Sequence, residues 1–160
     1  MKSKPDATKR TSDAPSPVAQ AVKLCRANGE FVAALAGLYA RVDASVAEKN
    51  PPCRACGKCC DFDGIGHRLY VTAGELAMLL TGPPPKPLGD GCPYQADNLC
   101  SARDRRPLGC RAFFCDEALA DWCHALYERW HAHLRTLHEQ HGLPYLYTEL
   151  RAALRQILPR

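Results

Sequence analysis

Residues 53–60 read Cys53-Arg54-Ala55-Cys56-Gly57-Lys58-Cys59-Cys60, a C-x-x-C-x-x-C-C run with four thiols. Four more cysteines follow it, namely Cys92, Cys100, Cys110 and Cys115. Thiolates gathered this closely repel one another unless a cation lies among them, so the spacing indicates a metal site. The sequence therefore predicts these eight cysteines as metal ligands.

The spacing within the run bears on the kind of metal. C-x-x-C-x-x-C is the local spacing of three ligands to a [4Fe–4S] cluster, whose fourth ligand comes from elsewhere. Cys92 is a candidate fourth ligand because Pro93 follows it, as in the bacterial ferredoxin pattern. A four-cysteine zinc site accepts the same short spacings. An iron–sulfur cluster is thus the favoured cofactor and zinc the alternative. In either case Gly57 is expected to supply a positive φ.

The number of thiols suggests more than a single mononuclear site. Cys60 directly follows Cys59, and neighbouring side chains in a turn diverge, so one ion does not easily bind both. We expect two sites or one polynuclear site that share the eight ligands. One partition places Cys53, Cys56, Cys59 and Cys92 in one site and Cys60, Cys100, Cys110 and Cys115 in the other. The alternative is that one or two of the eight are merely buried thiols, which is also what we expect of Cys25 and Cys123 on their helices.

Length and composition set the remaining bounds. A chain of 160 residues fits one domain, and ten cysteines point either to disulfides or to metal ligation. The first residues lead into no apolar targeting segment, and no later stretch has the character of a membrane span. The expected location is therefore the cytoplasm, where disulfides are rare and clustered cysteines bind metal. The net charge of +4 is only a weak argument for a nucleic-acid partner.

The N-terminal part of the chain predicts a tail followed by helices. Residues 1–17 are polar and proline-rich, as in a disordered tail, and residues 18–160 are expected to form a single metal-binding domain. Apolar residues recur at helical intervals from Val18 to about Lys49, with a break at Asn28-Gly29. A short strand is expected over 64–71, and Thr72 and Glu75 have the spacing of a capping box that begins the next helix.

The second half predicts an irregular segment followed by helices. Residues 83–87 are a proline-rich connector, and residues 88–115 are expected to owe their order to cysteines rather than to an apolar core. A leucine and tryptophan stripe predicts a helix that ends near Gly142, before a last helix from about 146 to 158. The fold class is therefore mainly α. A small, irregular cysteine-rich metal-binding core (53–115) with short strands is flanked by N-terminal helices and by C-terminal helices (116–158).

Basic and histidine side chains accompany the cysteines. Arg106 and Arg111 are predicted to lie around the cofactor, where they either offset thiolate charge, which we favour, or hold an anionic substrate. His67 is either a substitute ligand, a hydrogen-bond donor to one, or a surface residue. His124, His131 and His138 repeat every seven residues and are expected on a solvated helix face.

The cysteine pattern also resembles a known family. Cys53-x-x-Cys56-Gly57-x-Cys59-Cys60, then Cys92-Pro93-Tyr94, Cys100 and Arg106-Pro107-x-x-Cys110-Arg111-x-Phe113-x-Cys115, is similar to the YkgJ-type CxxCxxCC family of zinc- or iron-chelating proteins. The resemblance covers roughly residues 53 to 115 and departs from the family at Ser101-Ala102-Arg103, where the family usually has x-Ile-Tyr. It implies a small cysteine-ligated metal domain. Related modules occur in a flagellin lysine methylase.

Three functions follow from these observations. The first is a metal or iron–sulfur protein that serves redox or metal-handling chemistry. The second is an enzyme or accessory in protein or peptide modification, which needs an open coordination position and a polar cleft. The third is a zinc-stabilised interaction module for protein or nucleic acid. We rank them in this order. The expected partners are thus a metal ion or cluster and a protein or peptide, with nucleic acid disfavoured and no membrane.

Overall fold

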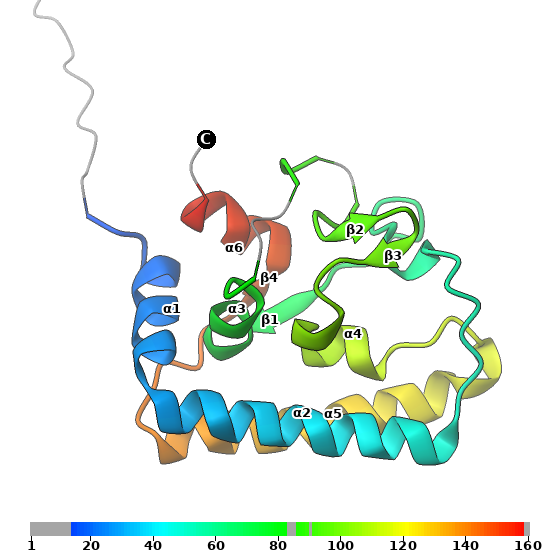
Figure 1. The fold of residues 1–160 in the computed structure, drawn as a ribbon, viewed down its shortest axis with the longest axis horizontal. Helices are drawn as coiled ribbons and strands as arrows, with labels where there is room; N and C mark the ends of the chain where they lie inside the picture. The colour runs from blue at the N-terminus through cyan, green and yellow to red at the C-terminus, as the bar shows by residue number, and fades with distance from the viewer. Residues whose placement is uncertain (1–13, 83–85, 90, 159–160) are drawn as a thin grey trace, which may run out of the picture.

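Two long helices form the base of the molecule. The computed structural model describes residues 14–82, 86–89 and 91–158. Helices α2 (Gly29–Lys49) and α5 (Ala120–Gln140) lie side by side and run in opposite directions, and the smaller elements lie on one side of this pair (Figure 1). The prediction of a mainly α fold with short strands is confirmed.

The remaining elements are short. They are the helices α1 (Pro17–Ala27), α3 (Ala73–Leu79), α4 (Leu108–Ala112) and α6 (Leu150–Ile157), and the 3-10 turns η1 (Lys58–Cys60), η2 (Arg103–Arg105) and η3 (Glu117–Leu119). Strands β1 (Tyr70–Thr72) and β4 (Tyr147–Glu149) pair antiparallel, with Val71 opposite Thr148. Strands β2 (Gln95–Ala96) and β3 (Leu99–Cys100) form a hairpin. Among the described helices, none is long and apolar enough to cross a membrane.

The predicted helix break at Asn28 is confirmed. The Asn28 side chain accepts a hydrogen bond of 2.9 Å from the Phe31 N–H and so caps α2. Helix α1 begins at Pro17, after the N-cap Ser16, so the predicted tail extends too far by these residues. Residues 1–13 of that tail, and 83–85 of the proline-rich connector, lie outside the described residues.

Strand β1 leads directly into α3 through the predicted capping box. Thr72 and Glu75 exchange the two hydrogen bonds of this motif, and both side chains are buried. The strand itself is shorter than the predicted 64–71, because only residues 70–72 have a pairing partner. That partner is β4, which occupies residues predicted as the start of the last helix. The last helix therefore begins at Leu150, where the Glu149 carboxylate accepts hydrogen bonds from two backbone N–H groups.

One apolar core connects all the helices. It includes Tyr94, Ala102, Leu108 and Ala112, which come from the segment predicted to be ordered by cysteines alone. That prediction is wrong for these residues. Their burial removes apolar surface from water and holds the segment against α2 and α5.

The histidines of α5 also differ from the prediction. His124 is exposed, but His131 is half-buried and His138 is fully buried. The His138 ring contacts Phe31 edge-on at 4.8 Å between centroids. The prediction that these histidines lie on a solvated helix face is therefore wrong for His131 and His138. The cause is β4 and the loop before it, which cover this part of α5 and place Tyr145 beside both rings.

Because His138 is buried, we expect the folded protein to become less stable as the pH is lowered. Burial lowers the pKa of His138, so below about pH 6.5 the unfolded chain takes up a proton that the folded chain resists. The free energy of unfolding is thus expected to fall with pH, with His138 contributing up to about 1.4 kcal/mol between pH 7.5 and 5.5. Urea unfolding at both values measures this. His138→Phe should reduce the dependence and His124→Phe should leave it unchanged, while an unaltered dependence in His138→Phe would contradict the interpretation.

Candidate metal centre and adjoining pocket

The cysteine run turns tightly beneath the β2–β3 hairpin. Gly57 has φ of 73°, which confirms the predicted positive φ. It is also pressed against the hairpin, since a Cβ atom there would lie 2.5 Å from Gln95 Nε2 and 2.9 Å from Asn98 Oδ1. The backbone conformation therefore favours glycine, and a larger residue would also have to displace the Gln95 and Asn98 side chains.

Two hydrogen bonds connect the hairpin and the residues just before it to the cysteine run. The Cys92 N–H donates to the Cys60 carbonyl oxygen at 2.9 Å, and Gln95 Nε2 donates to the Gly57 carbonyl oxygen at 3.0 Å. Cys100 lies opposite Gln95 in the hairpin register. These contacts bring thiols from three separate parts of the sequence to one place.

Helix α4 adds Cys110 to this group. Its N-terminus is held by the buried carboxylate of Glu75, which accepts a hydrogen bond of 2.7 Å from the Leu108 N–H. The same carboxylate accepts the Thr72 N–H at 2.8 Å and lies 3.5 Å from the Tyr39 hydroxyl. Glu75 thus joins α2, α3 and α4 at a single point. The sequence predicted only its local capping role.

Arg111 fixes the other face of α4. Its guanidinium is buried, makes a 2.5 Å ion pair with Asp43, and donates to the carbonyl oxygens of Asp104 and Arg106. It also lies 4.1 Å from the centroid of the Tyr39 ring. These contacts use the guanidinium to connect α4 with α2 and with the loop before α4.

Five thiols influence one another electrostatically, namely Cys59, Cys60, Cys92, Cys100 and Cys110. A hydrogen bond with Cys60, burial and the charge of Cys60 raise the pKa of Cys59. The hydrogen bond with Cys59 lowers the pKa of Cys60, but the hydrogen bond with Cys92, burial and neighbouring thiols raise it to about 11. Burial, then the charges of Cys100 and Cys60, raise the pKa of Cys110. This group is called the thiol cluster below.

Arg106 acts electrostatically on two thiols of the thiol cluster. Its charge lowers the pKa of Cys59 and of Cys110, although other causes outweigh it. Its Nε donates to the Arg103 carbonyl oxygen at 3.1 Å. The two arginines predicted around the cofactor thus differ: Arg106 acts on the thiols, and the Arg111 guanidinium is engaged with Asp43 and the backbone.

The thiol cluster as defined above leaves out three of the eight predicted ligands. Cys53, Cys56 and Cys115 are exposed. All ten cysteines are described, and all are free thiols. Among the described residues, no group of three or more His, Cys, Asp or Glu is placed so that it could hold a metal ion. The predicted core positions of Cys25 and Cys123 are confirmed, since both are buried.

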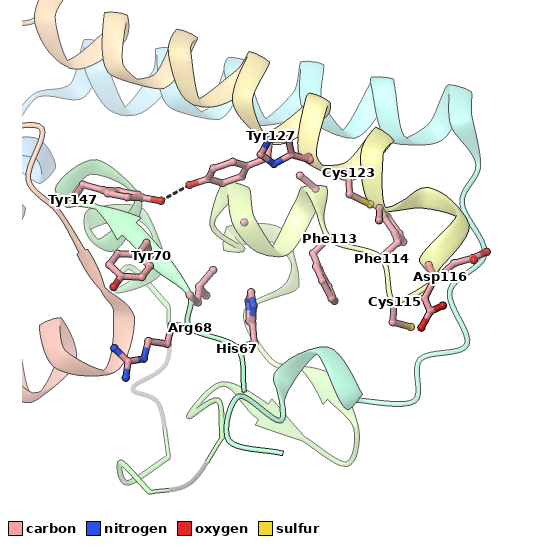
Figure 2. Close-up of a pocket in the computed structure, with 16 residues that line it drawn as sticks. His67, Arg68, Tyr70, Phe113, Phe114, Cys115, Asp116, Cys123, Tyr127 and Tyr147 are labelled. Atoms are coloured by element: carbon pink, nitrogen blue, oxygen red, sulfur yellow. Dashed lines mark hydrogen bonds between the residues drawn. The ribbon is translucent and has the colours of Figure 1, made fainter. Parts of the chain in front are cut away.

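A pocket of about 520 Å³ lies on the side of α4 where Gly109 and Ala112 are placed. Aromatic rings surround it, from His67 and Phe113 at one end to Tyr127 and Tyr147 at the other (Figure 2). The rings of His67 and Phe113 stack at 5.4 Å, and burial lowers the pKa of His67. His67 is therefore neither a plain surface residue nor a member of the thiol cluster. Sequence reasoning missed this pocket, because its walls come from segments that are far apart in the sequence, namely β1 and the residues before it, α4, α5 and β4.

Comparison with known proteins adds no relative. No protein-family model matches the chain, and no curated protein or solved structure matches it. The resemblance to the YkgJ-type family accordingly stays a prediction that rests on the cysteine motif.

Proposed function

We propose that this chain is a cysteine-ligated metal-binding protein of the cytoplasm that serves redox or metal-handling chemistry. An iron–sulfur cluster is the favoured cofactor and zinc the alternative. The observation that carries the proposal is the thiol cluster, in which five thiols from the run, the hairpin and α4 act on one another. Four thiolates are what either cofactor takes.

The chemistry of the donor set supports this proposal. The raised pKa values of Cys59, Cys60 and Cys110 mean that the thiolate forms are costly while no cation lies among them. A bound cation reverses that balance, because it stabilises each thiolate that it contacts. The thiols must turn toward a common point to bind, and the exposed Cys59 has room to do so. When bound, an iron–sulfur cluster supplies electron transfer.

Metal analysis of anaerobically purified protein tests the proposal. We expect iron and acid-labile sulfide, with broad visible absorption, and their absence together with the absence of zinc would refute metal binding. One or two zinc ions per chain without colour would instead favour a structural role.

Two substitutions test whether the thiol cluster is where the metal binds. Cys60→Ala is expected to remove most of the bound metal, because Cys60 interacts with Cys59, Cys92 and Cys100. Cys25→Ala is the matched control, since Cys25 is a fully buried thiol in α1 outside the thiol cluster. Equal metal content in the two variants would show that the metal is held elsewhere.

A further inference from the structure

The pocket beside α4 has the dimensions and walls of a small-molecule site. Its volume of about 520 Å³ lies within the range of ligand pockets. Leu69, Ala112, Phe113 and Phe114 contribute apolar wall. Gly109 keeps the space open near Leu69, because a Cβ atom at residue 109 would lie 2.6 Å from Leu69 Cδ1.

The charged lining residues lie at the rim. Arg68, Asp116 and Glu117 are exposed. Arg68 and Asp116 are drawn at opposite outer edges of the pocket (Figure 2). His67 has a pKa lowered by burial, so its ring is uncharged at neutral pH. A charged ligand would therefore have to give up water without a buried partner of opposite charge, which is costly.

Two hydroxyl groups provide the polar contact at one end of the pocket. Tyr127 and Tyr147 lie with their hydroxyl oxygens 2.6 Å apart, as the dashed line in Figure 2 shows. Their shared hydrogen bond uses one of the two protons, and neither hydroxyl has another partner among the described residues. The pair can therefore donate one hydrogen bond and accept another.

We propose that this pocket binds a small, uncharged aromatic molecule that carries one hydroxyl or carbonyl oxygen. The ring lies between the aromatic walls, where offset and edge contacts with Phe113, Phe114 and His67 favour it. The oxygen lies against the Tyr127–Tyr147 pair. None of the five thiols of the thiol cluster lines the pocket, so this proposal does not depend on metal binding.

Calorimetric titration of the full chain with three probes tests the proposed chemistry. 2-Naphthol is expected to bind saturably, and naphthalene about fivefold more weakly because it lacks the hydroxyl. 2-Naphthalenesulfonate is expected to bind at least about tenfold more weakly than 2-naphthol because it carries a charge. Tyr147→Phe should abolish the preference for 2-naphthol over naphthalene. A preference that survives this change would overturn the assigned role of the hydroxyl pair.

A variant that fills the pocket tests whether 2-naphthol binds there. Ala120 is an exposed lining residue on α5, and Ala125 is an exposed alanine of the same helix outside the pocket. Ala120→Trp should fill the pocket and abolish 2-naphthol binding, while Ala125→Trp should bind like the unmodified chain. Equal binding by the two variants, or no saturable binding by the unmodified chain, would overturn the proposal.

Discussion

Glu75→Ala is expected to lower the free energy of unfolding by about 3–9 kcal/mol. The Glu75 side chain is 2% exposed and accepts the backbone N–H groups of Thr72 and Leu108 as well as the Tyr39 hydroxyl. Its loss leaves three buried donors unpaired, and each unpaired donor costs about 1–3 kcal/mol. Urea unfolding monitored by circular dichroism measures the change.

Two further variants separate this role from a general loss of negative charge. Glu75→Gln keeps one acceptor oxygen but turns an amide toward the remaining donors, so we expect about half the loss. Glu128→Ala removes an exposed carboxylate from α5 and is expected to change the free energy by less than about 0.5 kcal/mol. If Glu75→Ala is as stable as Glu128→Ala, then Glu75 does not hold the three helices together.

Arg111→Ala is expected to cost about 3 kcal/mol, the second-largest effect. The change removes two hydrogen bonds to carbonyl oxygens, the ion pair with Asp43 and the contact with the Tyr39 ring. Hydrogen bonds to a charged group contribute about 1.5–3 kcal/mol each, and the exposure of Asp43 reduces the share of the ion pair. The midpoint of urea unfolding again provides the measurement.

Further variants test whether the shape of the Arg111 guanidinium, and not its charge alone, stabilises the fold. Arg111→Lys keeps the charge but cannot reach three acceptors on different sides, so we expect it to lose at least half as much stability as Arg111→Ala. Asp43→Ala should cost only about 1 kcal/mol because the two carbonyl contacts remain. Arg103→Ala is the control, since Arg103 is exposed in the same segment. Full stability of Arg111→Lys would assign the effect to charge alone.

Local signals in the sequence predicted local structure well. The break at Asn28, the capping box at Thr72 and the positive φ of Gly57 each depend on a few adjacent residues, and the structure confirms all three. The helical class followed from apolar periodicity in the same way.

Long-range packing accounts for what the sequence did not predict. The start of the last helix was wrong because residues 147–149 pair with a strand more than 70 positions earlier, which no local pattern reveals. His138 carries a polar side chain at a position that Phe31 of α2 and the loop before β4 bury together. A shared role for Cys60, Cys92 and Cys110 was expected from their chemistry, but the partition offered from the sequence separated Cys92 from the other two. Which thiols are neighbours depends on hydrogen bonds between distant loops.

Asp63 makes contacts with residues that the ribosome adds to the chain much later. Its carboxylate accepts the Gly91 N–H at 3.1 Å, next to Cys92, and makes two hydrogen bonds of 2.8 and 3.0 Å with Arg151, 88 positions away. A growing chain adds about 5–20 residues per second, so roughly 4–18 s separate Asp63 from its partner in α6. During that interval the segment from Asp63 to Cys92 lacks this contact with α6.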